Sequence, residues 1–130
     1  MDKKGYYKYL FIISAFFNWI SSITFLFMSI FNPNTFSSFG MSYPPTLFFL
    51  HALLGLIFTY GIGYFIVSLD ITKNQGAVIL GIVSKLVFFS CCVIYFLLGD
   101  INFIILVLGV CDFGFACLFI EFLINSKKIQ

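Results

Sequence analysis

Lys85 and Asp112 are charged residues that lie deep inside long apolar stretches of the chain, residues 77–98 and 101–124. A lysine near the centre of a bilayer costs about 2.5–3.5 kcal/mol on insertion scales, so it is expected to have a partner. Charged residues within membranes also commonly line a substrate, ion or proton pathway. These two side chains are therefore the first candidates for chemistry in this sequence.

Asn18 is expected at the same depth as this charged pair. With a helical rise of 1.5 Å per residue, Lys85, Asn18 and Asp112 should lie about 12, 13 and 18 Å from one end of the bundle. The lysine stem can cover the remaining difference. Because only residues 99–100 separate two apolar stretches, the helices that carry Lys85 and Asp112 should form an antiparallel hairpin. We predict an ion pair between them, with Asn18 beside it as part of a ligand or proton site.

The sequence leaves three functions open for this polar centre. It could bind or transport a small or lipidic ligand, or couple to protons. Alternatively, the ion pair could only fix helix register in a non-catalytic accessory or assembly subunit of a larger membrane complex. A third possibility is an enzyme acting on a lipid or a quinone, with Lys85 or Asp112 as general acid or base. No catalytic residue can be assigned, and the first two functions are favoured over an enzyme.

His51 is a further candidate for the ligand or proton site. It lies near the start of the apolar stretch 47–69, toward the opposite end from Lys85. A lone histidine at that level is more often a hydrogen-bonded interface residue than a proton carrier. A relay through His51 to Asp112 is conceivable on depth, but no spacing requires it.

The apolar stretches that hold these residues define the class of the protein. Of the 130 residues, 62% are hydrophobic and only 9% are charged, whereas soluble domains carry roughly 25% charged residues. Each stretch reaches the length of about 20 residues that a helix needs to cross a bilayer. Four helices are predicted, at about 10–31, 47–69, 77–98 and 101–124. The fold class is an all-α membrane protein, a four-transmembrane-helix antiparallel bundle that forms a single domain over residues 1–130.

The remaining lysines predict how this bundle is oriented. They lie before the first stretch, in the connection 70–76 and after the last stretch: Lys3, Lys4, Lys8, Lys73, Lys127 and Lys128. Cytoplasmic segments of membrane proteins carry the excess of lysine and arginine. Both termini should therefore be cytoplasmic, in a multi-pass protein of the cell membrane, with a bacterial inner membrane as the expected location. The uncharged, aromatic-rich segment 32–46 should lie in the outer headgroup region or form a lid. Membrane lipids are expected partners, and nucleic acid is not.

Small residues indicate where helices approach one another. Gly55, Thr59 and Gly63 form a ridge with four-residue spacing, and Gly81 lies in a similar pattern on the following helix. Such ridges allow close backbone contact in membranes. The sequence leaves open whether they serve contacts within one chain, in a homo-oligomer or with a larger membrane-protein partner.

The cysteines do not indicate a redox or metal centre. They occur at positions 91, 92, 111 and 117, without a C-x-x-C pair and without a histidine nearby. Buried cysteine usually behaves as a small hydrophobic residue. No metal and no cofactor are expected.

A set of residues across the last three stretches resembles a pattern of small, uncharacterised four-helix bacterial inner-membrane proteins, loosely similar to the DoxX-like group. The residues that carry the resemblance are Gly63-Tyr64, Asp70, Asn74, Gly81, Lys85, Gly99, Asp112, Phe115 and Phe119-x-x-Phe122. The resemblance implies the four-helix plan and brings no activity or catalytic residue with it.

Overall fold

The computed structural model describes residues 2–129, and their side chains as far as Ser126. Its helices are α1 (Lys3–Phe31), α2 (Thr35–Ser38), α3 (Phe48–Leu69), α4 (Gln75–Leu97) and α5 (Phe103–Ile129). Within the described range there is no strand, which confirms the all-helical prediction. Four of the described helices, α1, α3, α4 and α5, are long and apolar enough to cross a membrane.

Each long helix differs from its predicted bounds at one end or both, most at the start of α1 and at the end of α5, which runs to Ile129 rather than to residue 124. α1 begins at Lys3 because the Asp2 side chain caps it, accepting a hydrogen bond of 2.8 Å from the Gly5 amide. The helix α2 was not predicted. It forms where Phe36 turns inward and is buried, with its ring 5.4 Å from that of Tyr43. The segment expected at the outer interface thus has a fixed, folded core of its own.

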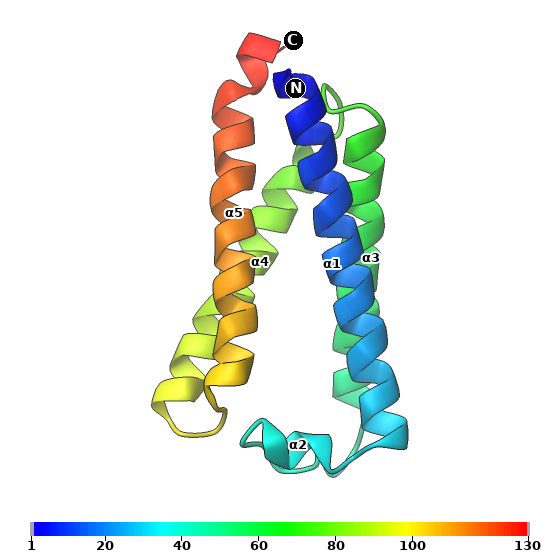
Figure 1. The fold of residues 1–130 in the computed structure, drawn as a ribbon, viewed down its shortest axis with the longest axis vertical. Coiled ribbons are helices and arrows are strands. Elements are labelled where there is room, and N and C mark those ends of the chain that lie inside the picture. The colour runs from blue at the N-terminus through cyan, green and yellow to red at the C-terminus, as the bar shows by residue number, and fades with distance from the viewer. Residues whose placement is uncertain (1, 130) are drawn as a thin grey trace.

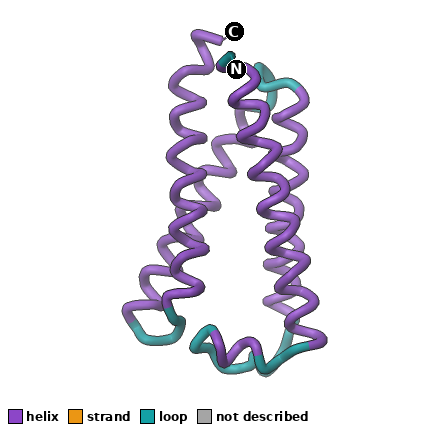
Figure 2. Tube along the Cα trace, in the orientation of Figure 1, coloured by secondary structure: helices purple, strands orange, loops and turns teal. Residues whose placement is uncertain are grey.

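The long helices are arranged as two pairs, α1 with α3 and α4 with α5 (Figure 1). The pairs meet at the end of the molecule where both termini and the α3–α4 connection lie. They diverge toward the opposite end, which the α2 segment crosses (Figures 1 and 2). We call these the terminal end and the α2 end.

Aromatic side chains fill the space between the pairs at the terminal end. The Phe11 ring stacks on Phe119 at 4.9 Å and meets Phe122 edge-on at 5.0 Å. Tyr7 and Tyr64 complete this buried cluster. Each such ring pair contributes about 0.5–1.5 kcal/mol beyond burial. Packing contacts of this kind hold the two pairs together at this end.

Two glycines allow close helix contact within the bundle. A Cβ atom at Gly81 would lie 2.6 Å from the Tyr64 ring, so α4 can approach α3 only without a side chain there. A Cβ atom at Gly61 would likewise lie 2.6 Å from the Trp19 indole nitrogen, between α3 and α1. Gly81 was singled out from the sequence, whereas Gly61 was not.

The predicted ridge on α3 faces away from the rest of the chain. A Cβ atom at Gly55 or Gly63 would meet no atom within 4 Å, and the exposed Thr59 hydroxyl donates to the Gly55 carbonyl of its own helix. On α5, by contrast, a Cβ atom at Gly109 would lie 2.9 Å from the Cys92 thiol. The ridge therefore plays no part in packing within the chain.

The α3–α4 connection is an ordered polar turn. Asp70 accepts hydrogen bonds from the Thr72 hydroxyl at 2.6 Å and the Thr72 amide at 3.0 Å, and these bonds hold the pKa of Asp70 below its ordinary value. Asn74 follows with a positive φ of 65°, a conformation that asparagine tolerates. The turn keeps the ends of α3 and α4 adjacent.

Candidate functional site

The structure brings Lys85 and Asp112 into contact in the middle of the molecule. The Lys85 Nζ lies 3.1 Å from the Asp112 Oδ1. Only 3% of the Lys85 side chain is exposed, compared with 15% of the Asp112 side chain. The ammonium is therefore enclosed, while the carboxylate remains partly accessible.

Asn18 connects this ion pair to the other helix pair. Its Oδ1 lies 3.5 Å from the Lys85 Nζ, a long hydrogen bond. Its Nδ2 donates to the Ile57 carbonyl on α3 at 3.0 Å. Asn18 therefore links α1, α3 and α4 at a single level.

Aromatic rings surround the Lys85 ammonium. The Nζ lies between 5.1 and 6.0 Å from four ring centres, those of Phe17, Tyr64, Phe115 and Phe119. A cation within about 6 Å of a ring face is attracted by the ring quadrupole. These rings were not assigned to the site from the sequence, although Phe119 shares the Asp112 face of α5. The ammonium is thus satisfied by groups of its own chain.

The polar centre lies at the level where the two helix pairs separate. On the terminal side of this centre, the buried aromatic cluster leads to three side chains that hydrogen-bond to one another. There the Tyr7 hydroxyl donates to Glu121 Oε1 at 3.2 Å and accepts from Asn125 Nδ2 at 3.1 Å. Within the described residues, hydrogen bonds and ring contacts between the long helices of the two pairs reach no further toward the α2 end than this centre. The closed part of the bundle ends here.

At the α2 end the two pairs are joined only through the α2 segment, as far as the described residues show. The Asn102 amide donates to the Phe39 carbonyl at 2.9 Å. The Asn102 side-chain nitrogen donates to the Ser38 carbonyl at 2.6 Å. These bonds tie the α2 segment to the start of α5, across the diverging ends of the pairs.

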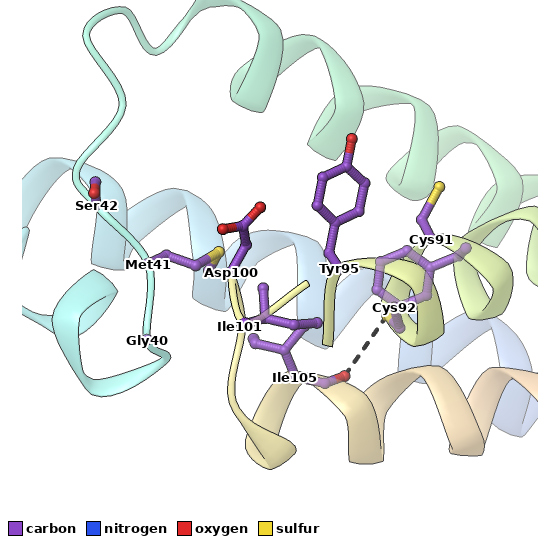
Figure 3. Close-up of a pocket in the computed structure, with 11 residues that line it drawn as sticks. Gly40, Met41, Ser42, Cys91, Cys92, Tyr95, Asp100, Ile101 and Ile105 are labelled. Carbon is purple, nitrogen blue, oxygen red and sulfur yellow. Dashed lines mark hydrogen bonds between the residues drawn. The ribbon is translucent and has the colours of Figure 1, made fainter. Parts of the chain in front are cut away.

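A cavity of about 500 Å³, open to the surface rather than enclosed, lies beneath this bridge (Figure 3). It extends along α4 and the start of α5, and its walls include Met41, Phe88, Cys91, Tyr95, Asp100 and Ile105. Phe88 lies one helical turn beyond Lys85 on the same helix. The cavity therefore begins about 5 Å from the polar centre along α4.

His51 lies apart from this centre. Its Nε2 is 3.0 Å from the Ser29 Oγ, and the Ser29 hydroxyl donates to the Leu26 carbonyl at 2.7 Å. Since the hydroxyl proton is used, we assign the Nε2 as the donor in this pair. His51 fastens the start of α3 to the end of α1, and no described hydrogen bond joins it to Lys85 or Asp112.

The cysteines are all free thiols. Cys92 is buried and lies 3.8 Å from the Ile105 carbonyl oxygen, whereas Cys91, Cys111 and Cys117 are exposed. Within the described residues, no group of three or more histidine, cysteine, aspartate or glutamate side chains could hold a metal ion.

Comparison of the chain with protein-family models, curated proteins and solved structures found no match. The resemblance to the DoxX-like group stays a prediction. The fold therefore defines a class only, an all-helical chain with four candidate membrane spans, as expected of a multi-pass membrane protein.

Proposed function

We propose that this protein binds a small or lipidic ligand against α4 and the start of α5, beneath the α2 segment and on the α2 side of the Lys85–Asp112 pair. The observation that carries the proposal is the cavity of about 500 Å³ along α4, which begins one helical turn beyond Lys85. Ligand sites in proteins typically enclose about 300–1,000 Å³ and combine apolar walls with a few polar groups. The cavity has this size and this composition.

In this proposal the Lys85–Asp112 pair lies one helical turn beyond the lining of the site, which begins at Phe88. The Lys85 ammonium already has its partners, so a ligand or a proton reaches the partly exposed Asp112 carboxylate instead. The aromatic cluster on the terminal side blocks passage toward the termini. The state of the protein described here would thus be open from the α2 end only.

The lysine distribution supports an orientation for this site. Lys3, Lys4, Lys8 and Lys73 lie at the terminal end, while the side chains of Lys127 and Lys128 lie outside the described residues. By the positive-inside rule the terminal end is cytoplasmic. The protein would then be a multi-pass protein of a bacterial inner membrane, and its cavity would lie in the outer half of the bilayer.

The proposal is tested by filling the cavity. Cys91 lines the cavity and is exposed, whereas Cys117 is exposed and lies outside it. In native mass spectrometry of protein released gently from its membrane, a bound small mass should be lost in Cys91→Trp and retained in Cys117→Trp. Retention of the same mass in Cys91→Trp would contradict the proposal.

A second candidate function is that of an accessory subunit in a larger membrane complex. It is favoured because only 22–33% of the residues in the most apolar 18-residue segment of each long helix are buried within the chain. The outward-facing ridge around Gly55 and Gly63 leaves room for another helix, from a second copy or a larger partner. Under this function, Gly55→Leu with Gly63→Leu should disrupt a complex seen on native gels, while Asp112→Asn should leave it intact.

A further inference from the structure

Both apolar and aromatic side chains line the cavity at the α2 end. Phe88 and Tyr95 contribute rings from α4. Met41 and Ile105 contribute aliphatic surface (Figure 3). Asp100 supplies a carboxylate at the rim, on the connection between α4 and α5. A ligand that fits this lining has an apolar body and a polar or charged head.

The charge at this end of the molecule is negative. The chain has no lysine or arginine between residues 9 and 72 or between residues 86 and 126. Among the described side chains, Asp100 takes part in no ion pair, because the two salt bridges found are Lys73–Asp70 and Lys85–Asp112. The one described group at this end that can become cationic is the His51 side chain, whose Nε2 contacts the Ser29 hydroxyl. The rim carboxylate thus has no described cationic partner.

From this combination we infer that the cavity takes an amphipathic cation, an amine or quaternary ammonium joined to an apolar body. The inference rests on the proposed function and names the ligand class of the same site. Tyr95 lies near Asp100, whose amide donates to the Tyr95 carbonyl at 2.9 Å, so its ring can attract a quaternary ammonium while Asp100 offers the opposite charge. Phe88, deeper along α4, supplies apolar wall for the body of the ligand. An anionic amphiphile of the same shape would be repelled by the Asp100 carboxylate.

The test uses the thiols of the natural chain as reporters. Purified protein in dodecyl maltoside is treated with a maleimide, and labelling at each cysteine is measured by peptide mass spectrometry. The probes are dodecyltrimethylammonium, dodecanol and dodecanoate, which share a chain length and differ in head charge. At about ten times its Kd the cation should slow labelling of Cys91 about tenfold by mass action, and leave Cys117 unchanged. Cys117 therefore serves as the internal control for effects of the probe on the micelle.

Charge-neutral variants separate the role of Asp100 from general effects of charge. Asp100→Asn should raise the concentration of dodecyltrimethylammonium needed for protection about two- to fivefold, the scale of one lost charge contact at an exposed position. Asp70→Asn, at the terminal end, should not change it. Asp100 is exposed, so its substitution should leave the fold intact.

The outcomes distinguish this inference from the function on which it rests. Equal protection of Cys91 by all three probes, or protection unchanged in Asp100→Asn, would overturn the cation preference and leave a ligand site. Protection by none of the probes would also overturn the inference. The proposed function would then be tested separately, by whether the small mass bound to the wild-type protein is lost in Cys91→Trp.

Discussion

Lys85 and Asp112 form their 3.1 Å ion pair within one helix pair, between α4 and α5. The ion pair therefore does not itself join the two halves of the bundle. At this level the hydrogen bond between the two halves is made by Asn18, which contacts Lys85 on α4 as well as the Ile57 carbonyl on α3. The charged residues and the amide thus have separable roles, and substitutions can address each of them.

Removing the lysine alone should destabilise the bundle. Lys85→Met leaves the Asp112 carboxylate without its partner, and breaking a buried pair in this way costs about 3–5 kcal/mol. Lys85→Met with Asp112→Leu should recover part of that loss. The measurement is the free energy of unfolding in mixed micelles, with Lys73→Met in the exposed turn as the control. A double variant no more stable than Lys85→Met would show that the two residues are not energetic partners.

Asn18→Leu should loosen the two helix pairs. It removes the hydrogen bonds to Lys85 and to the Ile57 carbonyl, and interhelical hydrogen bonds in membranes average about 0.6 kcal/mol each. A loss of about 1 kcal/mol in unfolding free energy is expected. Ser22→Ala is the control, because the Ser22 hydroxyl donates to Trp19 of its own helix. Equal effects of the two substitutions would argue against a linking role for Asn18.

Glycine substitutions should distinguish Gly81, which packs against Tyr64, from the outward-facing ridge that includes Gly63. Gly81→Ala places a methyl group against the Tyr64 ring, and overpacking of this kind typically costs about 1–3 kcal/mol. Gly63→Ala meets no neighbouring atom and should be neutral in a monomer. Thermal unfolding of both variants in the same detergent measures the difference. If Gly63→Ala were the more damaging of the two, the ridge would be part of an interface between chains.

The bridge over the cavity should control access to it. Asn102→Asp keeps the Oδ1 acceptor that caps the Ile104 amide but removes the donor to the Ser38 carbonyl. The α2 segment should then open more often, and maleimide labelling of Cys92, which is buried and lines the cavity, should rise severalfold. Asn34→Asp, an exposed change of the same type, is the control. Unchanged labelling would mean that the Asn102 side chain does not hold the bridge closed.

The sequence predicted the long helices well because length and apolar composition alone decide whether a helix can span a bilayer. The depth argument also placed Lys85 and Asn18 at one level and Asp112 within reach of the lysine stem, since the rise of a helix is constant. These are properties of single helices and short connections. They can be read without knowledge of how the helices cross.

Features that depend on helix crossing were not predictable in this way. The aromatic rings around Lys85 come from α1, α3 and α5, so their convergence requires the crossing angles. Gly55 faces outward and Gly61 faces the neighbouring helix. The sequence could not show which side of α3 faces the bundle, because that helix is apolar on all sides and has no periodic pattern. The divergence of the pairs and the bridge to Asn102 are likewise relations between distant segments.

The most direct measurement is native mass spectrometry of the wild-type protein released gently from its own membrane. We expect the chain to carry one bound small molecule, of amphipathic character, that dissociates on collisional activation without unfolding the chain. A bare chain, or a chain that appears only in complex with a second protein, would contradict ligand binding as the central function. The second of these results would instead support an accessory subunit.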